Sequence, residues 1–124
     1  MNAKSIIIAE DDDEMRKAFA HALSAKGYRV RTAVDGVQAI ALCKSELPDL
    51  LITDVFMPNK GGFEVIEELR KEFPTVKIIS MSGHLDAHAM LHVGQHIGGD
   101  LSLTKPFYLE KALEAVKSLL TYPK

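Results

Sequence analysis

The chain has 124 residues, a length that fits one domain and leaves no room for a second. Its 47% apolar and 26% charged residues are typical of a globular protein, and its net charge of −2 gives no basic field for nucleic acid or an anionic membrane. No apolar stretch approaches the roughly 18 residues that span a bilayer, and the single cysteine, Cys43, suits a reducing compartment, so we expect one cytoplasmic domain over residues 1–124.

Short apolar runs alternate with longer segments of helical period, which is the pattern of repeated strand–helix–strand units. The first strand is predicted at 6–9, and an acidic run and a helix over about 13–26 follow it. Residues 28–33 alternate like a strand with one wetter face, which indicates the edge of a sheet. After the turn at Asp35-Gly36, a second helix runs to about Ser45. The apolar faces of these two helices are predicted from Met15, Ala18, Phe19, Ala22 and Leu23, and from Val37, Ala39, Ile40 and Leu42.

The second half of the chain continues the same alternation. Residues 50–54 form the third predicted strand, and a helix over 63–73 follows and ends before Pro74. The fourth strand is predicted at 76–81, a weaker helix over about 86–96, the fifth strand at 101–104 and a last helix over about 108–120. The chain therefore reads as five strands and five helices in strict alternation.

This alternation predicts an α/β fold with a parallel sheet and helices on both faces, because crossovers between parallel strands are right-handed. A closed eight-stranded barrel needs about 250 residues, so an open doubly wound sheet is the better fit to this chain. Ligands of such sheets bind at the carboxyl ends of the strands, where the winding reverses. Functional residues are therefore expected directly after each strand.

Acids, a hydroxyl and a base stand at these positions. They are Glu10, Asp11 and Asp12 after the first strand, Asp54 at the end of the third, Ser82 after the fourth and Lys105 after the fifth. Neighbouring strands lie about 5 Å apart. If the first and third strands are neighbours, Asp54 therefore joins Glu10 and Asp11 in one pocket.

Such a pocket has an electrostatic cost. Two carboxylates 4–8 Å apart repel each other by roughly 2–4 kcal/mol at an effective dielectric constant near 20. Three such pairs approach the whole stability of a small domain, about 5–15 kcal/mol. Either some of these acids are protonated or a cation lies among them. Oxygen ligands without His or Cys select a hard ion such as Mg²⁺, which is commonly completed by phosphate. Lys105 and Ser82 supply the charge and the hydroxyl that suit a phosphoryl group.

Each of these residues also has a purely structural interpretation. The acidic run from Glu10 to Glu14 suits a solvated helix start, and Asp12 or Asp13 suits the helix cap. Lys105 before Pro106 also suits an extended loop. The functional interpretation is favoured because all the groups fall on the same edge of a sheet that was inferred independently.

Four blocks of this chain resemble the receiver domain of two-component response regulators, in the right order and spacing, and the resemblance extends over essentially the whole chain. They are Ile6 to Asp12, Thr53 to Pro58, Gly61-Gly62 and Lys105-Pro106-Phe107. The resemblance implies a flavodoxin-like five-stranded sheet of order 2-1-3-4-5. It also implies a protein that is not an enzyme in the usual sense, since it catalyses only its own phosphorylation and slow dephosphorylation.

The resemblance also implies roles for single residues. Asp54 would be the phosphoacceptor, Ser82 the hydroxyl of the switch and Lys105 the partner of the phosphorylated aspartate. Mg²⁺ would be bound by Asp11, Asp54 and the backbone carbonyl of Phe56, with Glu10 acting through a coordinated water. The Lys105-Pro106 bond is expected to be cis.

Two departures from the family pattern leave questions open. Ser102 stands where the family often has an aromatic residue, so the coupling between the hydroxyl and that aromatic ring is missing or altered. Histidines recur every four residues at His84, His88, His92 and His96. We interpret them first as a polar solvated face, with a zinc or nickel site and a pH-sensitive partner surface as the alternatives.

The expected partners are a sensor histidine kinase or a histidine phosphotransfer protein as donor, and a downstream protein or an output domain outside this sequence as target. A flavodoxin-like electron carrier and an aspartate-based phosphatase share parts of the pattern. The acidic loop after the first strand argues against the carrier, and Phe56 in place of a second aspartate argues against the phosphatase. An interaction module that no longer uses phosphate is the remaining alternative.

Overall fold

The computed structural model describes residues 3–57, 59–82 and 100–121. The predicted helix at 86–96 and the four histidines at 84, 88, 92 and 96 lie outside the described residues. The described elements, in chain order, are β1 (Ser5–Ala9), α1 (Asp13–Ala25), β2 (Arg29–Ala33), α2 (Gly36–Ser45), β3 (Leu50–Asp54), α3 (Gly62–Glu72), β4 (Lys77–Ser82), β5 (Leu101–Thr104) and α5 (Leu109–Thr121).

The five strands form one parallel sheet in the order β2-β1-β3-β4-β5, as expected. β1 lies between β2 and β3, with Ala9 opposite Thr53. The residues of β1 and β3 are all buried, whereas β2 at the edge is only partly buried. This pattern agrees with continuous apolar runs in central strands and an alternating, wetter strand at the edge.

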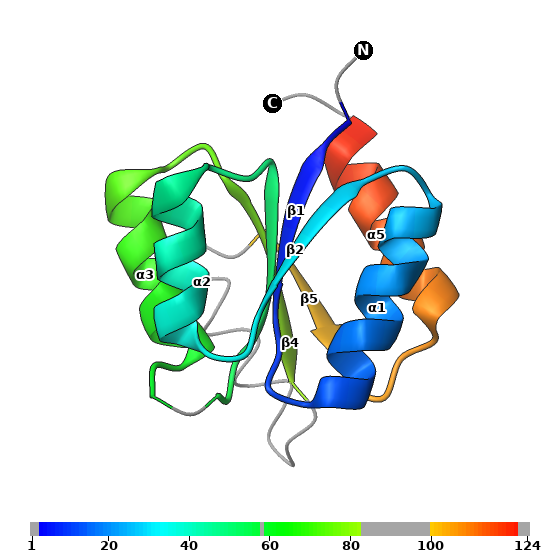
Figure 1. Cartoon of the computed structure of the whole chain (residues 1–124), viewed down its shortest axis with the longest axis horizontal. Helices are drawn as coiled ribbons and strands as arrows, with labels where there is room; N and C mark the ends of the chain where they lie inside the picture. The colour runs from blue at the N-terminus through cyan, green and yellow to red at the C-terminus, as the bar shows by residue number, and fades with distance from the viewer. Residues whose placement is uncertain (1–2, 58, 83–99, 122–124) are drawn as a thin grey trace.

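Helices cover both faces of the sheet (Figure 1). α1 and α5 pack on one face through Phe19, Leu23, Ala112 and Val116, and Ile6 and Ile8 of β1 face them. α2 and α3 pack on the other face around Ile7. Alternate residues of one buried strand therefore serve two hydrophobic cores, because successive side chains point to opposite faces. No described helix is long and apolar enough to cross a membrane.

The helix ends follow from local chemistry. Asp12 and Asp35 cap α1 and α2, and their carboxylates accept the backbone N–H groups of Met15 and Gln38 at 3.1 and 2.8 Å. Gly27, which follows the end of α1, has φ +97°, a value that glycine adopts without a steric penalty. Asp12 thus has the capping role that was one of its two interpretations.

Two predicted apolar positions are wrong. Ala18 of α1 is exposed, and Val37 of α2 is 55% exposed. Arg16, which the hydrophobic pattern left on the polar side of α1, is buried instead. Cys43 is fully enclosed between α2 and the sheet, and burial raises the pKa of its thiol to about 11.

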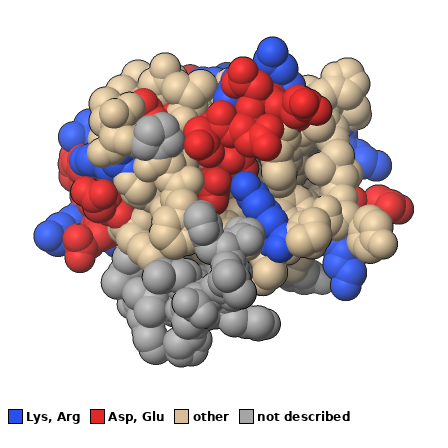
Figure 2. All heavy atoms as spheres, turned by 90° about the horizontal axis from the view of Figure 1, so that it is seen from below, with Lys and Arg blue, Asp and Glu red and all other residues tan. Residues whose placement is uncertain are grey.

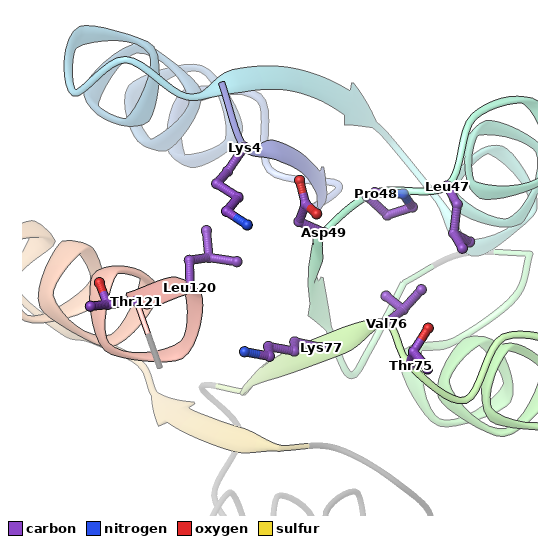
Figure 3. Close-up of a pocket in the computed structure, with 9 residues that line it drawn as sticks. All are labelled: Lys4, Leu47, Pro48, Asp49, Thr75, Val76, Lys77, Leu120 and Thr121. Carbon is purple, nitrogen blue, oxygen red and sulfur yellow. The ribbon is translucent and has the colours of Figure 1, made fainter. Parts of the chain in front are cut away.

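A hollow of about 600 Å³ opens at the amino ends of the strands (Figure 3). Lys4 before β1, Asp49 before β3 and Lys77 of β4 line it together with the end of α5. The carboxylate of Asp49 accepts the backbone N–H of Ser5 at 2.8 Å, which ties the starts of β1 and β3 together. This hollow lies at the opposite edge of the sheet from the predicted site.

Candidate functional site

The acidic turn after β1 divides into a buried part and a capping part. Glu10 has no exposed surface, although it is a carboxylate, and its backbone N–H donates to the carbonyl of Ala33 in β2 at 3.0 Å. Asp11 is exposed, and Asp12 caps α1. The backbone N–H of Asp12 also donates to Glu10 Oε2 at 3.2 Å. The turn therefore directs Glu10 inward and leaves Asp11 at the mouth of the site.

Asp54 is the last residue of β3 and is 6% exposed. Ala9 is the register partner of Thr53. The residues that follow them, Glu10 and Asp54, therefore lie side by side at the ends of neighbouring strands. Carboxylate oxygens of Glu10, Asp11 and Asp54 all lie within 4.8 Å of one another. The structure thus brings together the three acids that the strand order predicted.

Lys105 follows β5 and reaches across the sheet edge into this cluster. Its Nζ lies 2.5 Å from Glu10 Oε1 and 3.2 Å from Asp54 Oδ2. The backbone N–H of Lys105 donates to the carbonyl of Ser82 at 2.8 Å, and the Lys105-Pro106 bond is cis, as expected. One ammonium group therefore bridges two of the three acids.

Ser82 is the last residue of β4 and has no exposed surface, whereas the sequence pattern placed it just after the strand. Its strand neighbour is Thr104 of β5, and the residue before it, Met81, is the partner of Asp54. Ser82 therefore lies at the same edge as Asp54 and Lys105. Its role as a switch hydroxyl stays a prediction.

The shifted pKa values of Glu10, Asp11 and Lys105 show how burial and neighbouring charges act on the site. Burial raises the pKa of Glu10 and the Asp54 charge raises it further, although the hydrogen bond from Lys105 acts in the opposite direction. Burial and a hydrogen bond with Glu10 raise the pKa of Asp11. Burial alone would lower the pKa of Lys105, but Glu10 and Asp54 together raise it. The positive charge of Lys105 therefore does not fully offset the effects that raise the pKa values of Glu10 and Asp11.

The donor set fits a hard divalent cation. All the groups that converge are carboxylate oxygens, and within the described residues no His or Cys joins them. Figure 2 shows the carboxyl edge of the sheet, where acidic side chains gather and a basic side chain lies beside them. A cation among these oxygens would stabilise the ionised forms of Glu10 and Asp11, which burial disfavours.

The loop after β3 forms one wall of the site. Phe56 is 37% exposed and lines a hollow of about 530 Å³ together with Asp11, Asn59 and Glu64. The loop is fastened at its end, since Gly62 N–H donates to the Val55 carbonyl at 2.9 Å. The ligand role of the Phe56 carbonyl stays a prediction, and Phe56 and Asp11 line the same hollow.

The role of Arg16 was not found from the sequence. Arg16 donates from Nη1 to the carbonyl of Glu10 at 3.0 Å, and an arginine six residues after the first buried acid was the only signal for it.

Ser102, which stands where the family often has an aromatic residue, is partly buried and lies opposite Ser80 of β4. The hydroxyl of Ser80 is fully buried and has no hydrogen-bond partner among the described residues. Small hydroxyl groups therefore occupy this part of the sheet.

Comparison with known proteins gives a consistent result. A family model described as the response regulator receiver domain matches residues 6–117. The response regulator MprA of Mycobacterium ulcerans is 36% identical over 115 residues, which are 93% of this chain and 49% of the relative, so the chain spans about half the length of that relative.

Solved structures agree with this result. A putative response regulator from Chloroflexus aurantiacus has a TM-score of 0.89 at 28% identity, over 98% of this chain and 100% of that one. A CheY-like receiver domain protein from Methanospirillum hungatei has a TM-score of 0.91 at 26% identity, over 97% of this chain and 95% of that one. The solved structures and the family model therefore give the same assignment for this chain.

Proposed function

This chain belongs to the response regulator receiver domain family, whose members are phosphorylation-dependent switches of two-component signalling, and from that premise we propose that Asp54 is its phosphoacceptor. The observation that carries the proposal is the position of Asp54 between two acids and a lysine. Its carboxylate lies within 4.8 Å of the Glu10 and Asp11 oxygens and 3.2 Å from Lys105 Nζ.

The protein takes part in the phosphoryl transfer through a single covalent step. A carboxylate oxygen of Asp54 attacks the phosphorus of a phosphohistidine on the donor. A P–O bond forms as the P–N bond breaks, and the imidazole leaves with the electron pair of that bond. Phosphoryl transfer depends mainly on positioning and on charge neutralisation. Lys105 provides one positive charge beside Asp54, and the buried Ser82 is the hydroxyl expected to bond a phosphoryl oxygen.

Mg²⁺ is the expected cofactor. Asp11, Asp54 and the Phe56 carbonyl would hold it, with Glu10 acting through a coordinated water. When bound, the ion neutralises charge on the acids and on the incoming phosphoryl oxygens. The role of this chain is to keep those oxygens together despite their repulsion, and the fixed turn after β1 and the fastened loop after β3 support that role.

The donor is a sensor histidine kinase or a histidine phosphotransfer protein, and the receiver of the signal is a downstream protein or an output domain. The matched MprA relative is about twice as long as this chain, which supports the output domain in such longer proteins. The net charge of −2 supports a role without direct nucleic acid binding by this domain. We propose that the domain is located in the cytoplasm.

The test is incubation with acetyl phosphate and Mg²⁺, followed by intact mass measurement. We expect a gain of one phosphoryl group in the wild type and none in Asp54→Ala. Asp49→Asn is the matched control, because Asp49 lies at the amino edge of the sheet and an asparagine oxygen can still accept the Ser5 N–H. This control should gain the phosphoryl group as the wild type does.

The remaining alternative, an interaction module that does not use phosphate, gives a different result. In that case the wild type shows no mass gain with or without Mg²⁺. A mass gain that persists in Asp54→Ala would place the modification elsewhere and would contradict the assignment of Asp54.

A further inference from the structure

Arg16 is a buried cation in the first turn of α1, beside the acidic cluster. Its side chain is 10% exposed, although an arginine on a surface helix normally keeps its charged group in water. Its guanidinium donates from Nη1 to the Glu10 carbonyl at 3.0 Å and from Nη2 to the Asp13 carboxylate at 2.5 Å. The first of these hydrogen bonds is buried, and the second involves an acid that is 71% exposed.

The bond to Glu10 fixes the backbone at the point where the site begins. The N–H of Glu10 donates to the Ala33 carbonyl in β2, and the carbonyl of Glu10 accepts from Arg16. Both peptide planes that flank Glu10 are therefore held by hydrogen bonds. The second plane leads directly into Asp11, so its orientation sets where the Asp11 carboxylate lies relative to Glu10 and Asp54.

An arginine suits this position better than another basic residue. The planar guanidinium offers several N–H donors in a fixed arrangement, so one group bonds a carbonyl and a carboxylate at once. Without it, the carbonyl of a residue with no exposed surface would lose its partner, which disfavours the observed peptide orientation.

We propose that Arg16 is a positioning residue of the metal site, which holds the Glu10-Asp11 peptide so that the two carboxylates stay directed toward Asp54. It touches neither the phosphoryl group nor the ion. The proposal rests on the function proposed above, because it concerns the same cluster of acids. It assigns to Arg16 a part in Mg²⁺ affinity that is separate from its part in folding.

The experiment measures Mg²⁺ binding by calorimetry and thermal unfolding without Mg²⁺ for three variants. Arg16→Met removes both hydrogen bonds, Arg16→Lys keeps a charged donor for the Glu10 carbonyl, and Asp13→Asn removes only the exposed ion pair. We expect Arg16→Met to weaken Mg²⁺ binding roughly tenfold, as is typical when a residue that orients metal ligands is lost. Arg16→Lys should recover part of this loss, and Asp13→Asn should bind Mg²⁺ as the wild type does.

Phosphorylation by acetyl phosphate separates positioning from general damage. At low Mg²⁺ concentration Arg16→Met should gain the phosphoryl group slowly, and at saturating Mg²⁺ its rate should approach that of the wild type. A loss of rate that saturating Mg²⁺ does not restore would overturn the proposal. Because Arg16→Met could fail to fold, Arg16→Gln provides a second variant, with neutral N–H donors of its own and the same expected direction.

The proposal is overturned if Arg16→Met, or Arg16→Gln where the former does not fold, binds Mg²⁺ with the wild-type dissociation constant. It is also overturned if Asp13→Asn weakens binding as much as Arg16→Met, since the ion pair would then be the important contact. A wild type that neither binds Mg²⁺ nor gains a phosphoryl group would instead contradict the proposed function itself.

Discussion

Glu10 combines complete burial with a carboxylate, and Lys105 is its hydrogen-bonded cation. Burial and the nearby Asp54 keep the pKa of Glu10 above its ordinary value of 4.5, and burial keeps the pKa of Asp11 above 3.8. The folded protein therefore holds protons on these groups more tightly than the unfolded chain does. Without a metal ion, this contribution to stability is present at low pH and is lost as the pH rises through the folded pKa values.

We accordingly expect the metal-free protein to lose stability as the pH rises through the folded pKa values of Glu10 and Asp11, which lie above 4.5 and 3.8. Below these pKa values the trend reverses, because the pKa values of Asp13, Asp35, Glu46 and Glu68 are lowered by their partners and those contributions disappear in acid. Urea midpoints with EDTA at several pH values measure the effect. Glu10→Gln should flatten the upper part of the profile, and Glu14→Gln, a change at an exposed position of α1, should not. An unchanged slope in Glu10→Gln would contradict this assignment.

Single residues also show which parts of the site could be predicted from the sequence and which could not. The strand ends identified Glu10, Asp11, Asp54 and Lys105, because in a parallel sheet all strands finish at one edge. Arg16 could not be identified in this way, because its partner is a backbone carbonyl and hydropathy carries no information about backbone orientation. The same scale misplaced Val37, whose apolar side chain is 55% exposed on α2.

At the level of elements, α3 begins in very close contact with the end of β3. A Cβ atom on Gly62 would lie 2.2 Å from the Asp54 carbonyl oxygen and 2.9 Å from Val55 Cα, and both are backbone atoms that cannot move aside. At Gly61 the nearest atom would be the Val55 oxygen at 3.2 Å. The two adjacent glycines therefore differ sharply in the space that they leave.

Gly62→Ala should lower the free energy of unfolding by roughly 1–3 kcal/mol or more, as overpacking does, and should slow phosphoryl uptake because the Asp54 backbone is displaced. Gly61→Ala is the matched control and should have a clearly smaller effect on both. Urea unfolding and the acetyl phosphate assay measure the two quantities. Equal destabilisation by the two variants would show that helix α3 tolerates displacement from Asp54.

The element bounds were largely predictable, and the deviations have physical causes. The third and fifth strands match the predicted 50–54 and 101–104. β4 begins and ends one residue later than predicted, and it includes Ser82 because that residue still pairs with Thr104 of β5 and its carbonyl accepts the Lys105 N–H. The apolar pattern in the sequence ends before Ser82, whereas the hydrogen bonding between the strands includes this residue.

At the level of the whole molecule, Cys43 reports on opening of the fold. It is the only cysteine of the chain, it is 1% exposed in the core under α2, and its thiol pKa is raised to about 11. A thiol reagent therefore reacts with it only when the core opens. If the folded state binds Mg²⁺ as proposed, the ion should reduce the open population in proportion to its occupancy.

We expect labelling of Cys43 by a disulfide reagent at neutral pH to be at least about a thousandfold slower in the native protein than in urea, and to slow further when Mg²⁺ is added. Asp54→Asn should lose most of the Mg²⁺ effect, since it replaces a proposed carboxylate ligand of the ion by a neutral amide. Rapid labelling in native buffer that Mg²⁺ does not change would mean that α2 opens locally, independently of the site.

The hollow at the amino edge has a practical consequence. Lys4, just before β1, and Thr121, at the end of α5, line that same hollow, and the proposed phosphoacceptor Asp54 lies at the other edge of the sheet. A host protein could therefore carry this domain as an insertion in a surface loop, with both junctions close together. Such an insertion would keep both junctions away from the edge that carries Asp54, so the domain is suited to transfer into a host protein.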